Sequence, residues 1–112
     1  MRDDLVDIVR ELKEINKRLS EAYKTMWKEA KKYSDAERRY KIALHHKILE
    51  LKTSGQAVTL ILELAKGDEK IADLRFERDL AERYYETAKE SIRSLRVTAS
   101  VYQSILKVQD EV

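Results

Sequence analysis

The apolar residues of this chain recur at alternating spacings of three and four over most of its length, and no proline interrupts them. This repeat places apolar side chains along one stripe of a helix, which is the pattern of a coiled coil. The first seam, continuous apart from a stutter at its middle, consists of Leu5, Ile8, Leu12, Ile15, Leu19, Ala22, Met26, Ala30, Tyr33, Ala36, Tyr40, Leu44, Ile48 and Leu51. The spacing predicts one helix over about 3–52, while Ser34-Asp35 leaves open a new helix starting there.

A second seam follows in the other half of the chain and keeps a strict heptad with one polar residue, Arg78. It consists of Ile71, Leu74, Arg78, Ala81, Tyr85, Ala88, Ile92, Leu95, Ala99, Tyr102 and Leu106. This seam predicts a helix over about 68–109, with Asp68 as its N-cap. Both glycines of the chain lie between the seams. Gly55 suits the end of the first helix because glycine adopts the left-handed conformation freely, and 56–66 predicts a short turn helix ended by Gly67.

The two seams match when the chain folds back on itself at the glycines. If the numbers of facing residues add up to about 121, large residues repeatedly face small ones, as in Tyr33 with Ala88 and Ala36 with Tyr85. Close packing across two helices requires such an alternation. The expected fold is therefore all-α: one domain, 1–112, formed by a long antiparallel helical hairpin with a short apolar helix at its turn.

Composition excludes several classes of function. The formal net charge of the 112 residues is only +2, and there is no cysteine, which removes disulfides, thiolate metal sites and cysteine nucleophiles. His45-His46 with Glu50 has metal-ligand spacing, but no second pair supports it. No nucleophile, acid–base pair or phosphate-binding loop is visible, so we expect no catalytic residues, no metal and no cofactor. The default location is the cytoplasm, without a membrane span.

Some apolar residues find no partner in a single hairpin, and a helix that is apolar on two faces usually packs on two neighbours. The pairing rule leaves the beginning of the first helix overhanging, and the last helix carries a second stripe. We therefore expect a homo-oligomer, with a dimer forming a four-helix bundle favoured. The expected interface residues are Leu5, Ile8, Val9, Trp27, Val97, Val101, Ile105 and Val108.

The turn segment, 56–66, is apolar on all sides, so its surface must be buried against the hairpin or against another molecule. One reading packs it onto the core residues Ile48, Leu51, Ile71, Leu74 and Phe76; the other makes it a docking site for a partner protein. The expected partner-binding residues combine the turn segment with a basic strip on the first helix. The basic strip comprises Lys24, Lys28, Lys31, Lys32, Arg38, Arg39 and Lys41. The expected partner-binding residues are Val58, Leu60, Ile61, Lys28, Lys31 and Arg38.

The same strip offers an alternative, because lysines at helical spacing can follow a phosphate backbone and a neighbouring aromatic ring can stack on a base. The residues of this nucleic-acid reading are Lys24, Lys28, Lys31, Lys32 and Trp27. Acidic residues of the second helix lie opposite much of the strip and oppose this reading.

Residues 36–92 resemble a group of small helical early-region proteins from phages and prophages of Firmicutes. The resemblance rests on A-E-x-x-Y-x-x-A-L, K-I-L-x-L-K-x-x-G, L-A-x-G-D and R-x-x-R-D-x-A-E-x-x-Y. It implies a phage accessory protein acting in the host cytoplasm, and it assigns no catalytic residue. The expected function is to bind a host or phage protein, one form being inhibition of a nuclease or of a defence complex such as a CRISPR effector. The alternatives are a nucleic-acid-binding factor in phage recombination or replication, and a purely structural oligomer.

Overall fold

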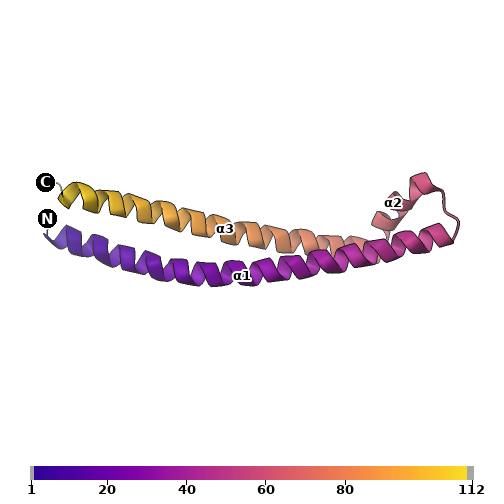
Figure 1. Cartoon of the computed structure of the whole chain (residues 1–112), viewed down its shortest axis with the longest axis horizontal. Coiled ribbons are helices and arrows are strands. Elements are labelled where there is room, and N and C mark those ends of the chain that lie inside the picture. The colour runs from indigo at the N-terminus through magenta and orange to yellow at the C-terminus, as the bar shows by residue number, and fades with distance from the viewer. Residues whose placement is uncertain (1, 111–112) are drawn as a thin grey trace. The chain divides into compact units, whose positions relative to one another are not determined.

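The computed structural model describes residues 2–110, with side chains from Asp4 to Gln109, and these residues form three helices and no strand (Figure 1). The helices are α1 (Arg2–Thr53), α2 (Val58–Gly67) and α3 (Glu69–Asp110). α1 passes through Ser34 without a break, so no new helix starts there. The expected all-α class, with a short apolar helix between two long ones, is confirmed.

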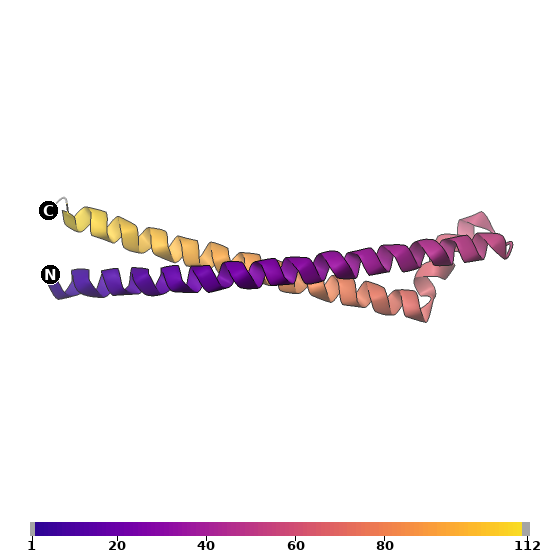
Figure 2. The same cartoon turned by 60° about the horizontal axis from the view of Figure 1, so that its bottom comes forward.

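Contacts between residues divide the chain into two compact units. The first unit holds α1 up to Lys28 together with α3 from Glu86, and the second holds everything from Glu29 to Tyr85, including α2. In each unit a length of α1 lies beside a length of α3 that runs in the opposite direction (Figures 1 and 2). The antiparallel pairing of the two seams is thus present in both units.

The seam that the sequence predicts is the face that the helices bury. Ile15 and Ile92 in the first unit are 4% and 5% exposed, and Ala36 and Tyr40 in the second unit are 4% and 5% exposed. Every other residue of the two seams is buried or half-buried, and none is exposed. Removal of this stripe from water is therefore the main force that holds α1 against α3.

The register of α1 against α3 in the second unit differs from the expected one. The Nζ atom of Lys47 lies 3.5 Å from a carboxylate oxygen of Asp68, and an Nη atom of Arg39 lies 3.4 Å from Glu77. The residue numbers of these pairs add up to 115 and 116 rather than to about 121. The expected register is therefore wrong by three to six residues, because Tyr40 and Arg78, which meet in the seam, add up to 118.

Two tyrosines of the second unit, whose numbers add up to 118, show a shift in the same direction. The ring of Tyr33 lies against that of Tyr85, with centroids 6.0 Å apart, whereas the expected register places Tyr85 against Ala36. α2 supplies the physical reason, because it runs back along the last turns of α1 and takes the space there (Figures 1 and 2). α3 consequently begins opposite Lys47 rather than opposite the end of α1.

Arg78, the polar residue of the second seam, is accommodated by an aromatic ring. Its guanidinium carbon lies 4.5 Å from the centre of the Tyr40 ring, and its Nη2 atom donates a hydrogen bond of 2.8 Å to Asp79. A guanidinium over a ring face is attracted by the negative π-surface. The side chain of Arg78 remains 23% exposed, so its charge keeps contact with water while its stem packs in the seam.

A glycine ends α1 as the sequence predicts. Gly55 has a φ of +82°, in the left-handed region. The backbone amide of Gln56 donates to the carbonyl of Leu51 over 3.2 Å, and that of Gly55 donates to Lys52 over 3.2 Å. These are the two hydrogen bonds of a Schellman motif, which satisfies carbonyls that the last turn of a helix leaves free.

Asp68 joins α2 to α3 within a single residue. Its amide donates to the carbonyl of Ala65, which closes α2, and its carboxylate accepts a hydrogen bond of 3.3 Å from the amide of Ile71, which caps α3. The N-cap predicted for the last helix is thus confirmed. The hydrogen bond from Ile71, helped by the charge of Lys47, lowers the pKa of Asp68 below its ordinary value of 3.8.

Replacing Asp68 is expected to lower Tm at pH 7, more for Asp68→Ala than for Asp68→Asn. Asparagine still caps the helix, whereas alanine removes both the cap and the ion pair with Lys47. Because the folded-state pKa of Asp68 is depressed, its ionised carboxylate stabilises the fold above pH 3.8, and this contribution is lost as the pH falls through the folded-state pKa. Thermal unfolding followed by circular dichroism between pH 2 and pH 7 measures the effect. The gap between wild type and Asp68→Asn should close at the acid end, and equal Tm values for wild type and Asp68→Ala at pH 7 would contradict the assignment.

Candidate functional site

The exposed apolar side of α2 is the strongest candidate for a functional surface. Only Ile61 and Ala65 of this helix are buried, at 4% and 0% exposure. We call its remaining large apolar side chains the tip surface: Val58, Leu60, Leu62 and Leu64, which are 81%, 53%, 47% and 44% exposed. Thr59, Glu63 and Lys66 give α2 one narrow polar stripe, and apolar residues occupy the rest of its circumference. α2 is covered on one side only within this chain.

The structure divides the expected partner-binding residues of the turn. Val58 and Leu60 are exposed, as a docking surface requires. Ile61 is buried, so its assignment to that surface is wrong. Ile61 and Ala65 lie on the side of α2 opposite its polar residues Thr59, Glu63 and Lys66, so the helical spacing does indicate which face meets the hairpin. The core interpretation is confirmed for Ile61 and Ala65, and docking through the exposed face stays a prediction. Phe76 is 67% exposed, so its expected place in the core under α2 is wrong.

Further large apolar side chains of the second unit are exposed and were not assigned to a surface from the sequence. They are Ile42, Leu49, Leu80 and Tyr84, between 41% and 58% exposed, in addition to Phe76. The signal that identifies them is their position off the two seams, with Phe76 and Leu80 one helical turn apart. Contiguous apolar patches are uncommon on proteins that act alone, although single exposed residues are normal.

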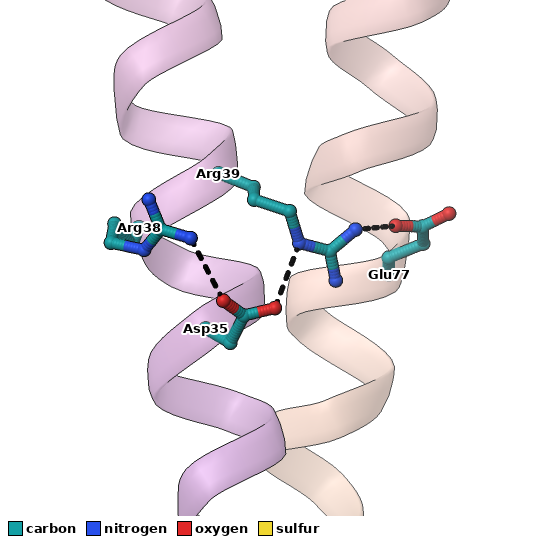
Figure 3. Close-up of polar contacts among 4 residues, drawn as sticks. All are labelled: Asp35, Arg38, Arg39 and Glu77. Atoms are coloured by element: carbon teal, nitrogen blue, oxygen red, sulfur yellow. Dashed lines mark hydrogen bonds and ion pairs between the residues drawn. The ribbon is translucent and has the colours of Figure 1, made fainter.

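Arg38, expected to contact a partner, belongs to a network of charges across the second unit. Asp35 accepts hydrogen bonds from Arg38 and Arg39 over 3.0 and 3.1 Å, and Arg39 reaches on to Glu77 of α3 over 3.4 Å (Figure 3). The hydrogen bond from Arg38, together with the charge of Arg39, lowers the pKa of Asp35 below 3.8. Arg38 is exposed, but its charge is already matched by a carboxylate.

The basic strip is largely neutralised by acidic residues of α1 itself. Its internal ion pairs are Lys24 with Glu21 at 3.5 Å, Lys32 with Glu29 at 4.0 Å and Lys41 with Glu37 at 3.4 Å. Each pair lies three or four residues apart, which is the spacing of neighbours on a helix surface. This balance weakens the strip as a binding surface for a phosphate backbone.

Two lysines of the strip, Lys28 and Lys31, and the neighbouring Trp27 are exposed and take no part in these ion pairs. Among residues 4–109, no carboxylate forms an ion pair with Lys28 or Lys31, and both lysines are exposed. Trp27, in the first unit, is 68% exposed, whereas its neighbour Tyr23 is half-buried with the guanidinium carbon of Arg96 6.0 Å from its ring centre. Of the residues in the nucleic-acid reading, Trp27, Lys28 and Lys31 are therefore the ones available to a partner.

The expected oligomer residues fall into separate places in the first unit. Leu5 and Ile8 are half-buried, like most other residues of the first seam. Val9 lines a shallow surface formed by α1 alone, with Val6 and Arg10 among its neighbours. The other apolar residues form what we call the outer stripe of α3: Val97, Val101, Ile105 and Val108, which are 60%, 54%, 38% and 60% exposed. The surface lined by the outer stripe contains residues of α3 only.

Possible metal ligands among the polar groups do not cluster in the described residues. Within the described part of the chain, no three histidine or acidic side chains gather as metal ligands would. His45 and His46 are exposed, and Glu50 pairs with Lys47. No helix within residues 2–110 has an apolar stretch long enough to cross a membrane. No family model, curated protein or solved structure matches the chain.

Proposed function

We propose that this chain is a non-enzymatic helical protein that binds another protein through the tip surface of α2. The observation that carries the proposal is the exposure of four large apolar side chains on a ten-residue helix whose other face is buried. Burying one such side chain completely is worth about 1.5–3 kcal/mol. A partner that covers α2 would therefore gain a compact hydrophobic contact at the turn of the hairpin.

The identity of the partner is proposed from the resemblance to small phage proteins described above. A phage accessory protein acting in the host cytoplasm would meet host or phage proteins, and obstruction of a nuclease or of a defence complex such as a CRISPR effector is one form of this role. A protein partner suits the tip surface because its exposed residues are aliphatic, and aliphatic side chains offer neither charge to phosphates nor rings to bases.

A nucleic-acid-binding role is the second candidate, and it is favoured by a different observation. Trp27 is exposed, and its neighbours Lys28 and Lys31 have no carboxylate partner among residues 4–109. Such a role would use electrostatic attraction, so its binding would weaken steeply with salt. The tip surface would contribute nothing to it.

The substitution Leu60→Asp is expected to abolish partner capture, because it places a charge in the centre of an apolar contact. Tagged wild type, Leu60→Asp and Lys31→Glu are compared by affinity purification from lysates of the infected host, followed by quantitative mass spectrometry. The dissociation constant of any protein lost with Leu60→Asp is then measured with purified components, and an increase of roughly 100-fold is expected. Leu60 is 53% exposed, so the variant should remain folded, which circular dichroism verifies.

The outcomes separate the two candidates. Loss of a protein with Leu60→Asp and its retention with Lys31→Glu supports docking through α2. Loss of bound nucleic acid with Lys31→Glu alone supports the second candidate. If neither substitution removes any captured component, the proposal that α2 docks on a partner is wrong.

A further inference from the structure

The outer stripe of α3 lies on the side of the helix that points away from α1. At about 100° per residue, Val97 and Val108 lie about 160° and 180° around α3 from Ala99. Ala99 is a seam residue and only 8% exposed, so its side of α3 is the covered one in the first unit. α3 is thus apolar on two opposite faces, and α1 occupies only one of them.

Three residues of the outer stripe and the serine between them have spacings that are the same in both directions along the helix. Val97, Val101, Ser104 and Val108 follow one another at spacings of four, three and four. An identical helix turned end for end therefore presents the same spacing, with Val97 opposite Val108 and Val101 opposite Ser104 of the other copy. A twofold antiparallel pair can therefore lay this face of one copy on the same face of the other.

The same arrangement places large side chains opposite small ones. Ser100 and Ser104 line the surface together with the four apolar residues. In the antiparallel pairing Ile105 faces Ser100 of the other copy, and Val101 faces Ser104. Small residues opposite branched ones allow two helices to approach closely, which is the same principle that governs the seam between α1 and α3.

Charge selects the antiparallel orientation over the parallel one. Arg96 flanks the stripe at its beginning and Lys107 lies near its end, while the charge of Arg93 is matched by its ion pair with Glu90. A parallel pair would set each of these cations beside its own copy, which is unfavourable. In the antiparallel pair Arg96 faces Gln109, and Arg93 is separated from its own copy by about 28 Å of helix, well beyond a Debye length.

From this pattern we propose that the occupant of the outer stripe is a second copy of this chain, bound antiparallel through α3 alone. The inference is independent of the proposed docking through α2, which lies in the other unit. The contact spans 93–109, roughly 25 Å of one helix face, and such a small interface predicts a dimer with a Kd in the micromolar range. The expected oligomer interface is thereby restricted to α3, without Leu5, Ile8, Val9 or Trp27.

Sedimentation velocity of the full chain, from low micromolar concentrations to ~1 mM, tests the second copy. We expect a concentration-dependent dimer that Val101→Glu weakens by roughly 100-fold or more, because both copies bring a charge into the apolar contact. Val6→Glu is the matched control, since Val6 is 52% exposed against 54% for Val101 and lies on α1. A monomer at every concentration, or a dimer lost with Val6→Glu and kept with Val101→Glu, overturns the proposal.

Disulfide crosslinking tests the orientation, because the natural chain has no cysteine. Val97→Cys and Val108→Cys are made in separate chains that carry tags of different size, and they are oxidised alone and mixed. In the antiparallel dimer, each position lies about 16 Å along the helix from its own copy, too far for a disulfide. Crosslinks should therefore form in the mixture only. Crosslinking of either variant with itself, or none in any sample, contradicts the antiparallel pair.

Discussion

Replacing Ile61 with aspartate is expected to lower the free energy of unfolding by about 3 kcal/mol, whereas the same change at Leu60 leaves it nearly unchanged. The two positions are adjacent on α2, but Ile61 is 4% exposed and Leu60 is 53% exposed. Removal of a buried aliphatic side chain costs about 2–5 kcal/mol, and a carboxylate without a partner adds the cost of its own desolvation. Release of α2 into water limits the total, because the charge then becomes hydrated.

Thermal and urea unfolding of the two variants, at one fixed protein concentration, measures this difference. The concentration is held constant because a dimer would make Tm depend on it. Ile61→Asp should lower Tm by roughly 10–20 °C, and Leu60→Asp by no more than a few degrees. Equal losses of stability in the two variants would show that α2 is not anchored through Ile61.

The comparison also decides how a loss of binding is interpreted. If Leu60→Asp loses the partner at full stability, the loss comes from the contact itself. If Ile61→Asp loses it too, the reason is that the anchoring of α2 has failed, since Ile61 is not accessible to a partner. Adjacent residues of one helix thus separate recognition from the support that positions it.

The long helices and their ends could be predicted from the sequence because each signal is local. The 3-4 spacing marks the buried stripe, and every seam residue is in fact buried or half-buried. Gly55 was predictable because glycine adopts a positive φ without strain. Asp68 was predictable because its carboxylate reaches the amides of the first turn of α3.

The register could not be predicted because a heptad repeat does not define it. A slide of seven residues places seam residues opposite seam residues again, and tyrosines can again face alanines, so apolar pairing distinguishes poorly between the alternatives. The deciding contribution is the space taken by α2 beside the end of α1, which is visible only in three dimensions. The ion pair between Lys47 and Asp68 shows the resulting register, with the start of α3 beside Lys47.

The candidate surfaces were predicted where a residue lies off the seam, and missed in α2, where the polar face is narrow. Val101 and Val108 stand out from the sequence as a second stripe, and both are exposed. In α2 the choice between Leu60 and Ile61 does have a sequence signal, which the interpretation of the segment as apolar on all sides overlooked. Ile61 lies opposite the polar residues Thr59, Glu63 and Lys66, whereas Leu60 lies nearer to them.

The second large effect is expected at Tyr40, where Tyr40→Ala should lower the free energy of unfolding by about 3–5 kcal/mol. The ring is 5% exposed in the seam, and its removal leaves a cavity between two helices whose backbones are held apart by their other side chains. It also leaves the guanidinium of Arg78, 4.5 Å from the ring centre, without its aromatic partner. Tyr40→Phe keeps the ring and should cost less than about 1.5 kcal/mol.

A double-mutant cycle with Arg78→Ala separates packing from the interaction between cation and ring. Urea unfolding of wild type, both single variants and the double variant gives the coupling free energy, expected at about 0.5–2 kcal/mol in favour of the pair. A coupling near zero, with a large loss for Tyr40→Ala alone, would assign the whole effect to packing. A loss below about 1 kcal/mol for Tyr40→Ala would contradict its place in the core, because a buried ring that fills a seam cannot be removed at so small a cost.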